Sequence, residues 1–340
     1  MKLYSNEIVF RGHPDKVCDQ ISDALLDEYL KGDKNSRCGI ETCGGKGKIF
    51  ITGEVTSKSK VNVEEVVKKV LEDVGYDTSY EIINNLGIQS SDIAMGTNLK
   101  VKGAGDQGMM YGFATNETDK YLPLSMIILQ ELSKEYDLLR KRDSRFKSDG
   151  KAQITGYFTD DLRLIKIKTF TISYQNTELD RINTDNIIKE ICTNICNKYN
   201  IEIEEFLINP TGRFEIGGFA GDAGLTGRKI LVDNYESFSK VGGGAFSGKD
   251  PSKVDRSAAY KARLVAVDYL KKYNLEWCEV QISYAIGKRS PLSISIDSNI
   301  GNIEPNKKLY KECEPYNIIK DLNLLNECYY ERSKFGHFTN

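Results

Sequence analysis

Apolar and polar side chains alternate along several short stretches of this chain, as they do in strands of a sheet with one covered face. The stretches that predict strands are 48–55, 152–158, 164–173, 214–219 and 279–286, with a further short one at 230–232. Elsewhere apolar residues recur at helical spacing, which predicts helices over 63–74, 123–139, 186–199 and 257–273. Because strands and helices intermix, the pattern indicates an α+β fold with mixed or antiparallel sheets.

Two short phrases occur twice along the chain. GDQG at 105–108 is echoed by GDAG at 221–224, a shift of 116 positions, which is close to a third of the 340 residues. PDKV at 14–17 is echoed by PSKV at 251–254. Proline is favoured in the first turn of a helix, so each member of the second pair predicts the start of an amphipathic helix. The echoes predict three similar α+β units rather than one large sheet.

The composition is that of an ordinary folded protein without a strong net charge. Hydrophobic residues make up 40% of the chain, and 47 basic residues against 49 acidic ones give a formal net charge of −2. This balance provides no global positive field to attract nucleic acid or an anionic membrane. No apolar run is long enough to span a bilayer, and the polar N-terminus does not resemble a signal peptide. The eight cysteines lack metal-knuckle or redox spacing, which favours reduced thiols in a cytosolic protein.

The strongest candidate for chemistry is the phrase GGGAFSGKDPSKVD at 242–255. Glycines let backbone N–H groups approach phosphate oxygens, and the lysines add positive charge where a helix begins. Asp250 and Asp255 are oxygen donors of the kind that hold a divalent cation against phosphates. A flexible glycine linker is the alternative. The phrase is close to a P-loop, but Asp250 stands where that motif needs Ser or Thr, and no clear buried strand precedes it.

Two more phrases carry residue types that suit a polyanionic substrate. In GHPDK at 12–16, His13 can donate a hydrogen bond or a proton to a leaving oxygen, and Asp15 is a hard ligand suited to Mg²⁺. PTGRF at 210–214 and LTGRK at 225–229 place cations beside glycine. Taken singly, such residues are more often part of a solvated surface, and only their occurrence together favours a site. With only two histidines in the chain, a multi-histidine metal centre is excluded.

Together and in this order, the phrases resemble the S-adenosylmethionine synthetase family, also called methionine adenosyltransferases. GAGDQGMMYGF at 103–113 and GGGAFSGKD at 242–250 resemble the two signatures of that family. GHPDK, NPTGRF and DAGLTGRK match as well, so the resemblance covers nearly the whole chain.

The resemblance implies three similar α+β units around a pseudo-threefold axis. The expected units are 1–91, 103–216 and 217–340, interleaved in the chain, with a gating loop at 92–102. It also implies a homodimer with active sites at the subunit interface, paired into a dimer of dimers.

The resemblance further implies an enzyme that makes S-adenosylmethionine from ATP and L-methionine. The methionine sulfur attacks ribose C5′ and expels tripolyphosphate, which is then hydrolysed to phosphate and pyrophosphate. A thioether has no proton to lose, so the barrier must fall through alignment and through charge stabilisation of the polyanionic leaving group. The implied cofactors are two Mg²⁺ ions and one K⁺ ion per site, in a cytoplasmic protein without nucleic-acid or membrane partners.

Matching positions carry the site residues of the family over to this chain. The implied catalytic residues are His13, Lys151, Arg228 and Lys249. The implied ATP-binding residues are these four with Asp149, Arg213, Phe214, Asp222, Lys229 and Ala245, of which Arg213 and Phe214 contact the adenine. The implied methionine-binding residues are Glu54, Gln89, Asp106, Asp222 and Lys253, with Asp106 the partner of the ammonium group. Asp15 and Asp255 are the implied magnesium ligands, and Glu41 is the potassium-site carboxylate.

Some positions depart from the family pattern. Gly150 stands between Asp149 and Lys151 where the family usually has alanine, and the gating loop is atypical beyond Gly96. Two other functions stay open on the sequence. One is a nucleoside triphosphatase or kinase with a degenerate P-loop, which would release ADP. The other is a nucleotide sensor that kept the pocket without turnover.

Overall fold

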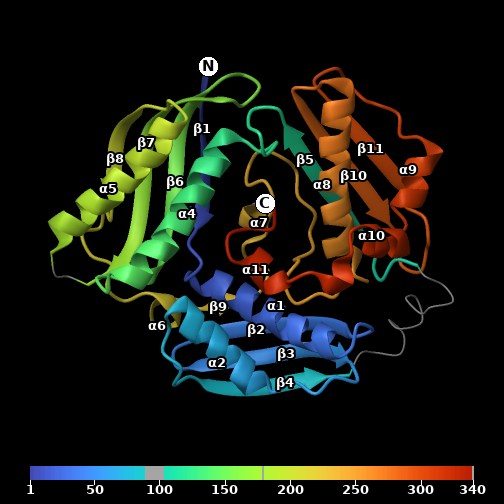
Figure 1. Ribbon diagram of the computed structural model, residues 1–340, viewed down its shortest axis with the longest axis horizontal. Helices are drawn as coiled ribbons and strands as arrows, with labels where there is room; N and C mark the ends of the chain where they lie inside the picture. The colour runs from blue at the N-terminus through green and yellow to red at the C-terminus, as the bar shows by residue number, and fades with distance from the viewer. Residues whose placement is uncertain (89–102, 178–179, 339–340) are drawn as a thin grey trace.

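The computed structural model describes residues 1–88, 103–177 and 180–338 of the chain. Within these residues the chain forms three small sheets, each with helices packed on one face (Figure 1). They surround a central region that holds α7 (Ile230–Asp233), α11 (Tyr329–Ser333) and the C-terminal residues. Most strand pairs are antiparallel, so the prediction of an α+β fold with mixed and antiparallel sheets is confirmed. No helix among the described residues is long and apolar enough to cross a membrane.

The first two units have one order of five elements, and the third repeats the first four of them. The first has α1 (Pro14–Gly32), β2 (Arg37–Gly45), β3 (Lys48–Thr56), α2 (Val63–Val74) and β4 (Glu81–Gly87). The second has α4 (Leu124–Arg142), β6 (Phe146–Phe158), β7 (Leu164–Asn176), α5 (Arg181–Lys198) and β8 (Ile203–Ile208). The third has α8 (Val254–Tyr273), β10 (Trp277–Tyr284), β11 (Ser293–Ser298) and α9 (Lys307–Glu312). It is followed by α10 (Pro315–Asp321) and the 3-10 turn Leu324–Asn326. In each unit the first helix leads into an antiparallel pair of strands.

Each sheet is completed at one edge by a strand from a distant part of the chain. β1 (Lys2–Val9) pairs with β6, β5 (Gly108–Thr115) with β10, and β9 (Gly224–Leu225) with β2, all antiparallel. The phrases GDQG and GDAG therefore have the same place in the fold, because one leads into β5 and the other into β9. Glycine is needed where β9 enters, since a Cβ at Gly224 would lie 2.2 Å from the carbonyl oxygen of Pro14.

Most predicted elements are present. The helices predicted at 63–74, 123–139, 186–199 and 257–273 correspond to α2, α4, α5 and α8. The strands predicted at 48–55, 152–158, 164–173 and 279–286 correspond to β3, β6, β7 and β10. Pro14 is the first residue of α1, whereas α8 begins at Val254, three residues after the proline of its echo.

Two predicted strands are wrong. Residues 214–217 form no regular element, and residues 218 and 219 belong to the short helix α6 (Gly218–Gly221). The side chain of Phe219 is fully buried, and its ring packs edge-on against that of Tyr76, with 5.3 Å between the ring centroids. Residues 230–232 belong to α7, which turns the side chain of Asp233 into the core. Apolar runs of three to six residues fit a strand or a helical turn equally well, so periodicity could not separate the two.

Helices cover one face of every sheet and leave the opposite face exposed (Figure 1). On β3, Ile49 and Ile51 are fully buried while Phe50 between them is 37% exposed. On β5, Met110 is buried and Met109 is 54% exposed. We call the side of the three sheets opposite the helices the uncovered face. Its exposed apolar residues include Leu3, Phe50, Met109, Leu207 and Leu225.

The contact between α8 and β5 provides a test of the fold. A Cβ at Gly112 on β5 would lie 2.0 Å from the carbonyl carbon of Ala262 on α8. Gly112→Ala is therefore expected to push the helix off the sheet and to lower the free energy of unfolding by about 2 kcal/mol, the usual scale of overpacking in a core. Urea unfolding followed through the fluorescence of Trp277 measures this. Gly243→Ala is the control, because nothing lies within 4 Å of a Cβ there, and equal stability of the two variants would contradict the packing.

Candidate active site

Two glycine-rich loops carry most of the predicted site residues, and both are held along one edge of β2. The loop 224–229 is bound near the end of the strand, where the Thr226 N–H donates to the Thr42 carbonyl at 3.0 Å. The loop 246–250 is bound near its start, where the Ile40 N–H donates to the Gly248 carbonyl at 3.0 Å. β9 alone is too short to pair the whole edge of β2, so the two loops supply the hydrogen bonds that the strand would otherwise lack.

The first cluster of predicted residues surrounds the start of α1, and we call it the histidine half-site. Its members are His13, Asp15, Asp149, Lys151, Asp222, Arg228 and Lys229. His13 is the N-cap of α1, and its Nδ1 accepts the Asp15 N–H at 3.2 Å.

The central unit contributes to the histidine half-site because the turn before α1 packs on β6. The Phe10 N–H donates to the Gly150 carbonyl at 2.9 Å, which brings Asp149 and Lys151 toward His13. Asp149 accepts the Gly218 N–H at 2.7 Å, and burial raises the pKa of its carboxyl to about 6.

Asp15 is fully buried and its carboxylate is surrounded by donors. Oδ1 accepts the Leu225 N–H at 2.9 Å and lies 3.2 Å from Nε of Arg228, while Oδ2 pairs with the Lys229 ammonium. A buried carboxylate needs such partners to offset the loss of hydration. Arg228 and Lys229, which are predicted to bind phosphate, thus form ion pairs with Asp15, which is predicted to bind magnesium.

The charge state of His13 follows from the same surroundings. Burial, with help from the ammonium groups of Lys229 and Lys151, lowers the pKa of His13 from 6.5 to about 4, although Asp15 acts in the opposite direction. The imidazole is therefore neutral at pH 7. Because Nδ1 accepts an amide hydrogen, the ring proton is assigned to Nε2. In the free protein His13 is a hydrogen-bond donor without a positive charge.

The second cluster lies at the other glycine-rich loop, and we call it the lysine half-site. Its members are Glu41, Glu54, Ala245, Lys249, Lys253 and Asp255. Glu41, Glu54, Ala245 and both lysines line a cavity of about 600 Å³. Nζ of Lys249 lies 2.6 Å from Oδ2 of Asp255 in the first turn of α8. This ion pair resembles the one between Lys229 and Asp15 in the histidine half-site.

Close backbone contacts bring the two family signatures together at Asp255. A Cβ at Gly244 would lie 2.1 Å from the Asp255 carboxyl carbon, so only glycine fits there without a shift. Gly108 also lies against Asp255, with the ideal Cβ position 3.7 Å from Oδ1. Asp106, two residues before Gly108, is exposed at the same end of β5.

Within one chain His13 and Lys249 lie far apart, although the two loops touch. A Cβ at Gly227 would lie 2.6 Å from the Cβ of Ala245, and the loops bind β2 at Thr42 and Ile40, only two residues apart. His13, however, precedes the first residue of α1, while Asp23, ten residues on, accepts the Gly248 N–H, and ten helical residues span about 15 Å. The expectation that His13 and Lys249 face one ligand is not met within a single chain.

Other predicted residues have different outcomes. Phe214 and Arg213 lie on the segment that leads toward Asp222, and Arg213 pairs with Glu215 at 2.8 Å. Gln89 and the predicted gating loop at 92–102 lie outside the described residues. Asp250, suggested as a second cation ligand in its loop, has a structural role that the sequence did not indicate. Its side chain is fully buried and accepts the Cys38 N–H at 2.8 Å, so it fixes the loop to β2.

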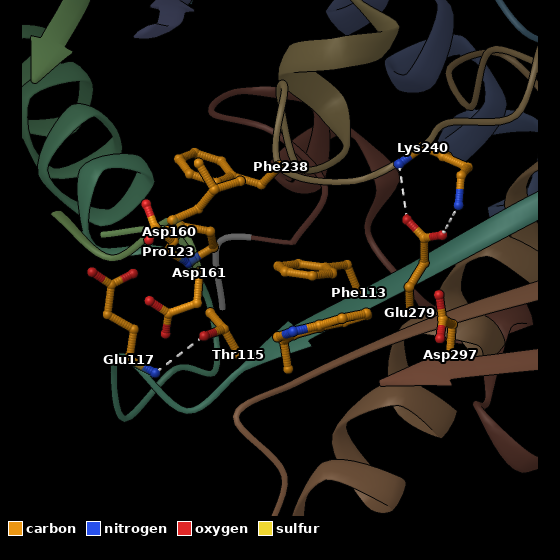
Figure 2. Close-up of a pocket in the computed structure, with 12 residues that line it drawn as sticks. Phe113, Thr115, Glu117, Pro123, Asp160, Asp161, Phe238, Lys240, Glu279 and Asp297 are labelled. Carbon is orange, nitrogen blue, oxygen red and sulfur yellow. Dashed lines mark hydrogen bonds and ion pairs between the residues drawn. The ribbon is translucent and has the colours of Figure 1, made fainter. Parts of the chain in front are cut away.

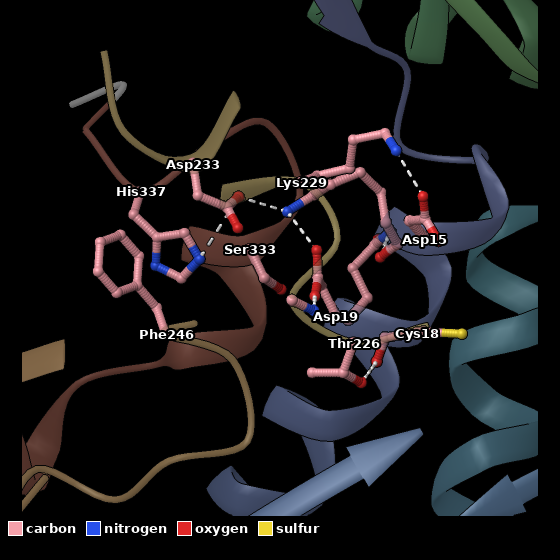
Figure 3. A network of polar contacts seen from close by, with 12 residues as sticks. Asp15, Cys18, Asp19, Thr226, Lys229, Asp233, Phe246, Ser333 and His337 are labelled. Carbon is pink, nitrogen blue, oxygen red and sulfur yellow. Dashed lines mark hydrogen bonds and ion pairs between the residues drawn. The ribbon is translucent and has the colours of Figure 1, made fainter. Parts of the chain in front are cut away.

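The sequence did not reveal a buried ion-pair network behind the histidine half-site (Figure 3). Nζ of Lys16 lies 2.6 Å from Oδ1 of Asp233 and 3.1 Å from Oδ2 of Asp19. His337 extends the network, because its Nε2 lies 3.8 Å from Oδ1 of Asp233. Burial lowers the pKa of the His337 imidazole well below its ordinary value. Polar residues on an amphipathic helix are typical of a solvated face. Here the C-terminal residues and α7 cover that face.

A separate cavity of about 300 Å³ lies on the uncovered face, where β5 and β10 approach the turn between β6 and β7 (Figure 2). Its lining includes Phe113, Trp277 and Glu279. Among the described residues that line it, none belongs to either half-site.

Among the described residues, no group of three or more His, Cys, Asp or Glu side chains could enclose a metal ion. In each half-site one carboxylate is the predicted magnesium ligand, Asp15 in one and Asp255 in the other. Proteins commonly hold Mg²⁺ with one or two carboxylates and the phosphate oxygens of a substrate. Asp15 and Asp255 therefore fit a divalent metal ion that substrate phosphates also bind.

Comparisons with known proteins match this architecture. Family models of the S-adenosylmethionine synthetase N-terminal, central and C-terminal domains match residues 1–99, 101–214 and 216–340. An S-adenosylmethionine synthase of Clostridium tetani is 40% identical, with 99% of this chain and 94% of the relative aligned. One of Mycoplasmopsis synoviae is 42% identical, with 99% and 92% aligned. The chain belongs to the S-adenosylmethionine synthetase family.

Membership in the S-adenosylmethionine synthetase family confirms the prediction of a methionine adenosyltransferase, an enzyme that makes S-adenosylmethionine from ATP and methionine. The alternatives of a kinase and of a non-catalytic sensor are set aside. The P-loop alternative also fails on structure, because residues 234–241 before the glycine loop form no strand.

The depressed pKa of His13 can be measured directly, because the chain has only two histidines. The ¹³Cε1 signal of His13 is expected to titrate with a midpoint of about 4 in the free protein. A non-hydrolysable ATP analogue should raise that midpoint, because nearby negative charge favours the protonated ring. The His13→Asn variant assigns the signal. A midpoint near 6.5 would contradict the buried position beside Lys229.

Proposed function

We propose that the active site forms between two copies of the chain, where the histidine half-site of one subunit meets the lysine half-site of its partner. The separation of about 15 Å along α1 between His13 and Asp23, which binds the Gly248 N–H, supports this arrangement. Both half-sites also border the uncovered face, on which Glu41 and Lys151 lie. Phe50 and Met109 add exposed apolar area to that face, which a partner subunit would bury.

The transfer is a direct displacement at ribose C5′ by the methionine sulfur, with tripolyphosphate as the leaving group. No general base is needed, since a thioether carries no proton. His13 donates its Nε2 hydrogen to the departing oxygen, and Lys151, Arg228 and Lys229 bind the phosphate chain. Lys249 of the partner half-site completes the set of cations. Donors placed where negative charge develops are the main source of rate enhancement in such a reaction.

Phosphate binding involves an exchange of partners in both half-sites. Lys229 and Lys249 are each paired with a carboxylate in the free protein. A triphosphate attracts both ammonium groups, and Asp15 and Asp255 are then available for the two Mg²⁺ ions. Magnesium in these positions would neutralise charge on the phosphate oxygens. Glu41, exposed on the wall of the lysine half-site cavity, is the proposed K⁺ carboxylate.

The remaining predicted residues recognise the substrates. For ATP these are Asp149, Arg213, Phe214, Asp222 and Ala245. For methionine they are Glu54, Gln89, Asp106, Asp222 and Lys253. An exposed carboxylate such as Asp106 suits the methionine ammonium, because a charge-assisted hydrogen bond is stronger than a neutral one. The same enzyme then hydrolyses tripolyphosphate to phosphate and pyrophosphate.

The proposed assembly is a homodimer, with two dimers paired into a tetramer, in the cytoplasm. The units 1–91, 103–216 and 217–340 would be related by a pseudo-threefold axis, which the repeated order of elements supports, and 92–102 would gate the site. All eight cysteines are free, as is usual in a reducing compartment.

The products identify the reaction. Incubation with ATP, methionine, Mg²⁺ and K⁺ is expected to yield S-adenosylmethionine, phosphate and pyrophosphate by mass spectrometry. Lys249→Met should lower kcat by roughly 100- to 1000-fold, the usual cost of losing one electrostatic donor to the transition state. Formation of ADP, or near-normal activity of Lys249→Met, would contradict the proposed chemistry.

Mixed dimers test whether two chains share each site. His13→Asn and Lys249→Met chains are each expected to be nearly inactive alone. When the two are refolded together in equal amounts, half of the dimers contain both chains, and one of their two sites has neither substitution. Activity should then return to about a quarter of wild type, as follows from twofold symmetry.

Two controls accompany that experiment. Each variant refolded alone shows that refolding itself restores nothing, and a chain carrying both substitutions, mixed with wild type, shows that wild-type subunits exchange freely. No recovery in the mixture of single variants would place both half-sites of one active site in one chain and overturn the shared site.

A further inference from the structure

Three aspartates spaced four residues apart on α1 accept backbone N–H groups of the two glycine-rich loops. Oδ1 of Asp15 and of Asp19 accept N–H groups of the loop 224–229 at 2.9 and 2.8 Å. Oδ1 of Asp23 accepts the Gly248 N–H at 2.8 Å. Residues four apart share one face of a helix, so α1 presents a row of acceptors to both loops. The helix that starts the histidine half-site thus also fixes the lysine half-site.

Asp23 acts there together with Arg256. The guanidinium of Arg256 pairs with Asp23, and its Nε donates to the Phe246 carbonyl at 2.8 Å. Both charged side chains are fully buried. Because Asp23 binds Gly248 and Arg256 binds Phe246, the ion pair holds both ends of the turn 246–248.

The turn 246–248 contains a residue in the left-handed region of backbone conformation, so its geometry depends on the contacts around it. Gly248 has a φ of +80°, and a Cβ there would lie 1.9 Å from the Ile40 carbonyl oxygen, so only glycine fits. Lys249 follows immediately and reaches Asp255, the residue before Arg256, at 2.6 Å. The loop is therefore attached to the first turn of α8 on two sides, by Asp255 at the site and by Arg256 in the core.

We propose that Asp23 and Arg256 are positioning residues for Lys249. They touch no substrate, and they set the backbone from which the Lys249 ammonium reaches the phosphate chain. The inference rests on the proposed role of Lys249 in catalysis. A displacement of about 1 Å at a catalytic group can cost on the order of 100-fold in rate, so a turn held from both ends has a direct kinetic consequence.

A purely structural ion pair would behave differently. Apolar residues of similar size can often replace a buried ion pair without loss of stability, whereas removing one partner leaves an unpaired charge. The double variant Asp23→Leu/Arg256→Met therefore separates positioning from stability. Lys261→Met/Glu312→Leu is the matched control, since it removes a partly buried pair, 3.5 Å apart, that joins α8 to α9.

The test compares kcat in two backgrounds, with Tm measured for every variant. In the wild-type background Asp23→Leu/Arg256→Met should lower kcat by roughly 10- to 100-fold, with little change in KM for methionine and a Tm close to that of the control pair. In the Lys249→Met background, measured by single turnover, the same double substitution should cost no more than about twofold, because residues that act through one group are not additive.

Rescue gives a second readout. Asp23→Asn/Arg256→Gln keeps an acceptor for Gly248 and a donor for Phe246 without charge, and it should recover most of kcat. If the Leu/Met variant does not fold, Arg256→Lys, which keeps the charge and loses the second contact, is compared in the same two backgrounds.

Several results would overturn the inference. Equal losses in the two backgrounds would mean that the pair acts independently of Lys249, and an unchanged kcat in the folded double variant would mean that the turn needs no such support. Near-normal activity of Lys249→Met alone would instead overturn the proposed role of Lys249, and the inference with it. The last outcome is distinct because it appears without any change at Asp23 or Arg256.

Discussion

The candidate site depends on the hydrogen bonds that attach two glycine-rich loops to one strand edge and one helix. β2 binds the loops 224–229 and 246–250 side by side, and the aspartates of α1 bind both from the other side. The loops touch at Gly227 and Ala245, but the ten residues of α1 from His13 to Asp23 keep His13 about 15 Å from the turn that precedes Lys249. The proposed active site therefore unites the histidine half-site of one chain with the lysine half-site of a second.

Charge is concentrated locally in a protein whose net charge is only −2. In both half-sites a lysine forms an ion pair with an aspartate, Lys229 with Asp15 and Lys249 with Asp255. Such pairs keep the free protein balanced, and in the proposed mechanism a triphosphate and its metal ions separate them. The neutral state of His13 fits this arrangement, because its ring adds a donor and no further charge.

The repeat explains both the shape of the molecule and the different uses of one phrase. PDKV starts α1 and PSKV leads into α8, yet the lysines of the two phrases have opposite surroundings. Lys16 is 1% exposed and pairs with Asp233 in the central region, whereas Lys253 lines the cavity of the lysine half-site. In the first unit the C-terminal residues and α7 cover the helix start, so that lysine stabilises the core instead of a substrate.

Local patterns in the sequence determined the mixed α and β architecture, most helices and the repeat, because glycine, proline and charged residues act through their own backbone and chemistry. They also singled out the glycine-rich loops and charged residues that the structure gathers into two clusters. The strands predicted at 214–219 and 230–232 failed, since Phe219 and Asp233 are drawn into a core built from other units. Tertiary structure alone decided which carboxylates are buried, why His13 is neutral, and that His13 and Lys249 lie apart. Those properties depend on which surfaces cover α1 and β2, and contacts between residues hundreds of positions apart leave no mark on local spacing.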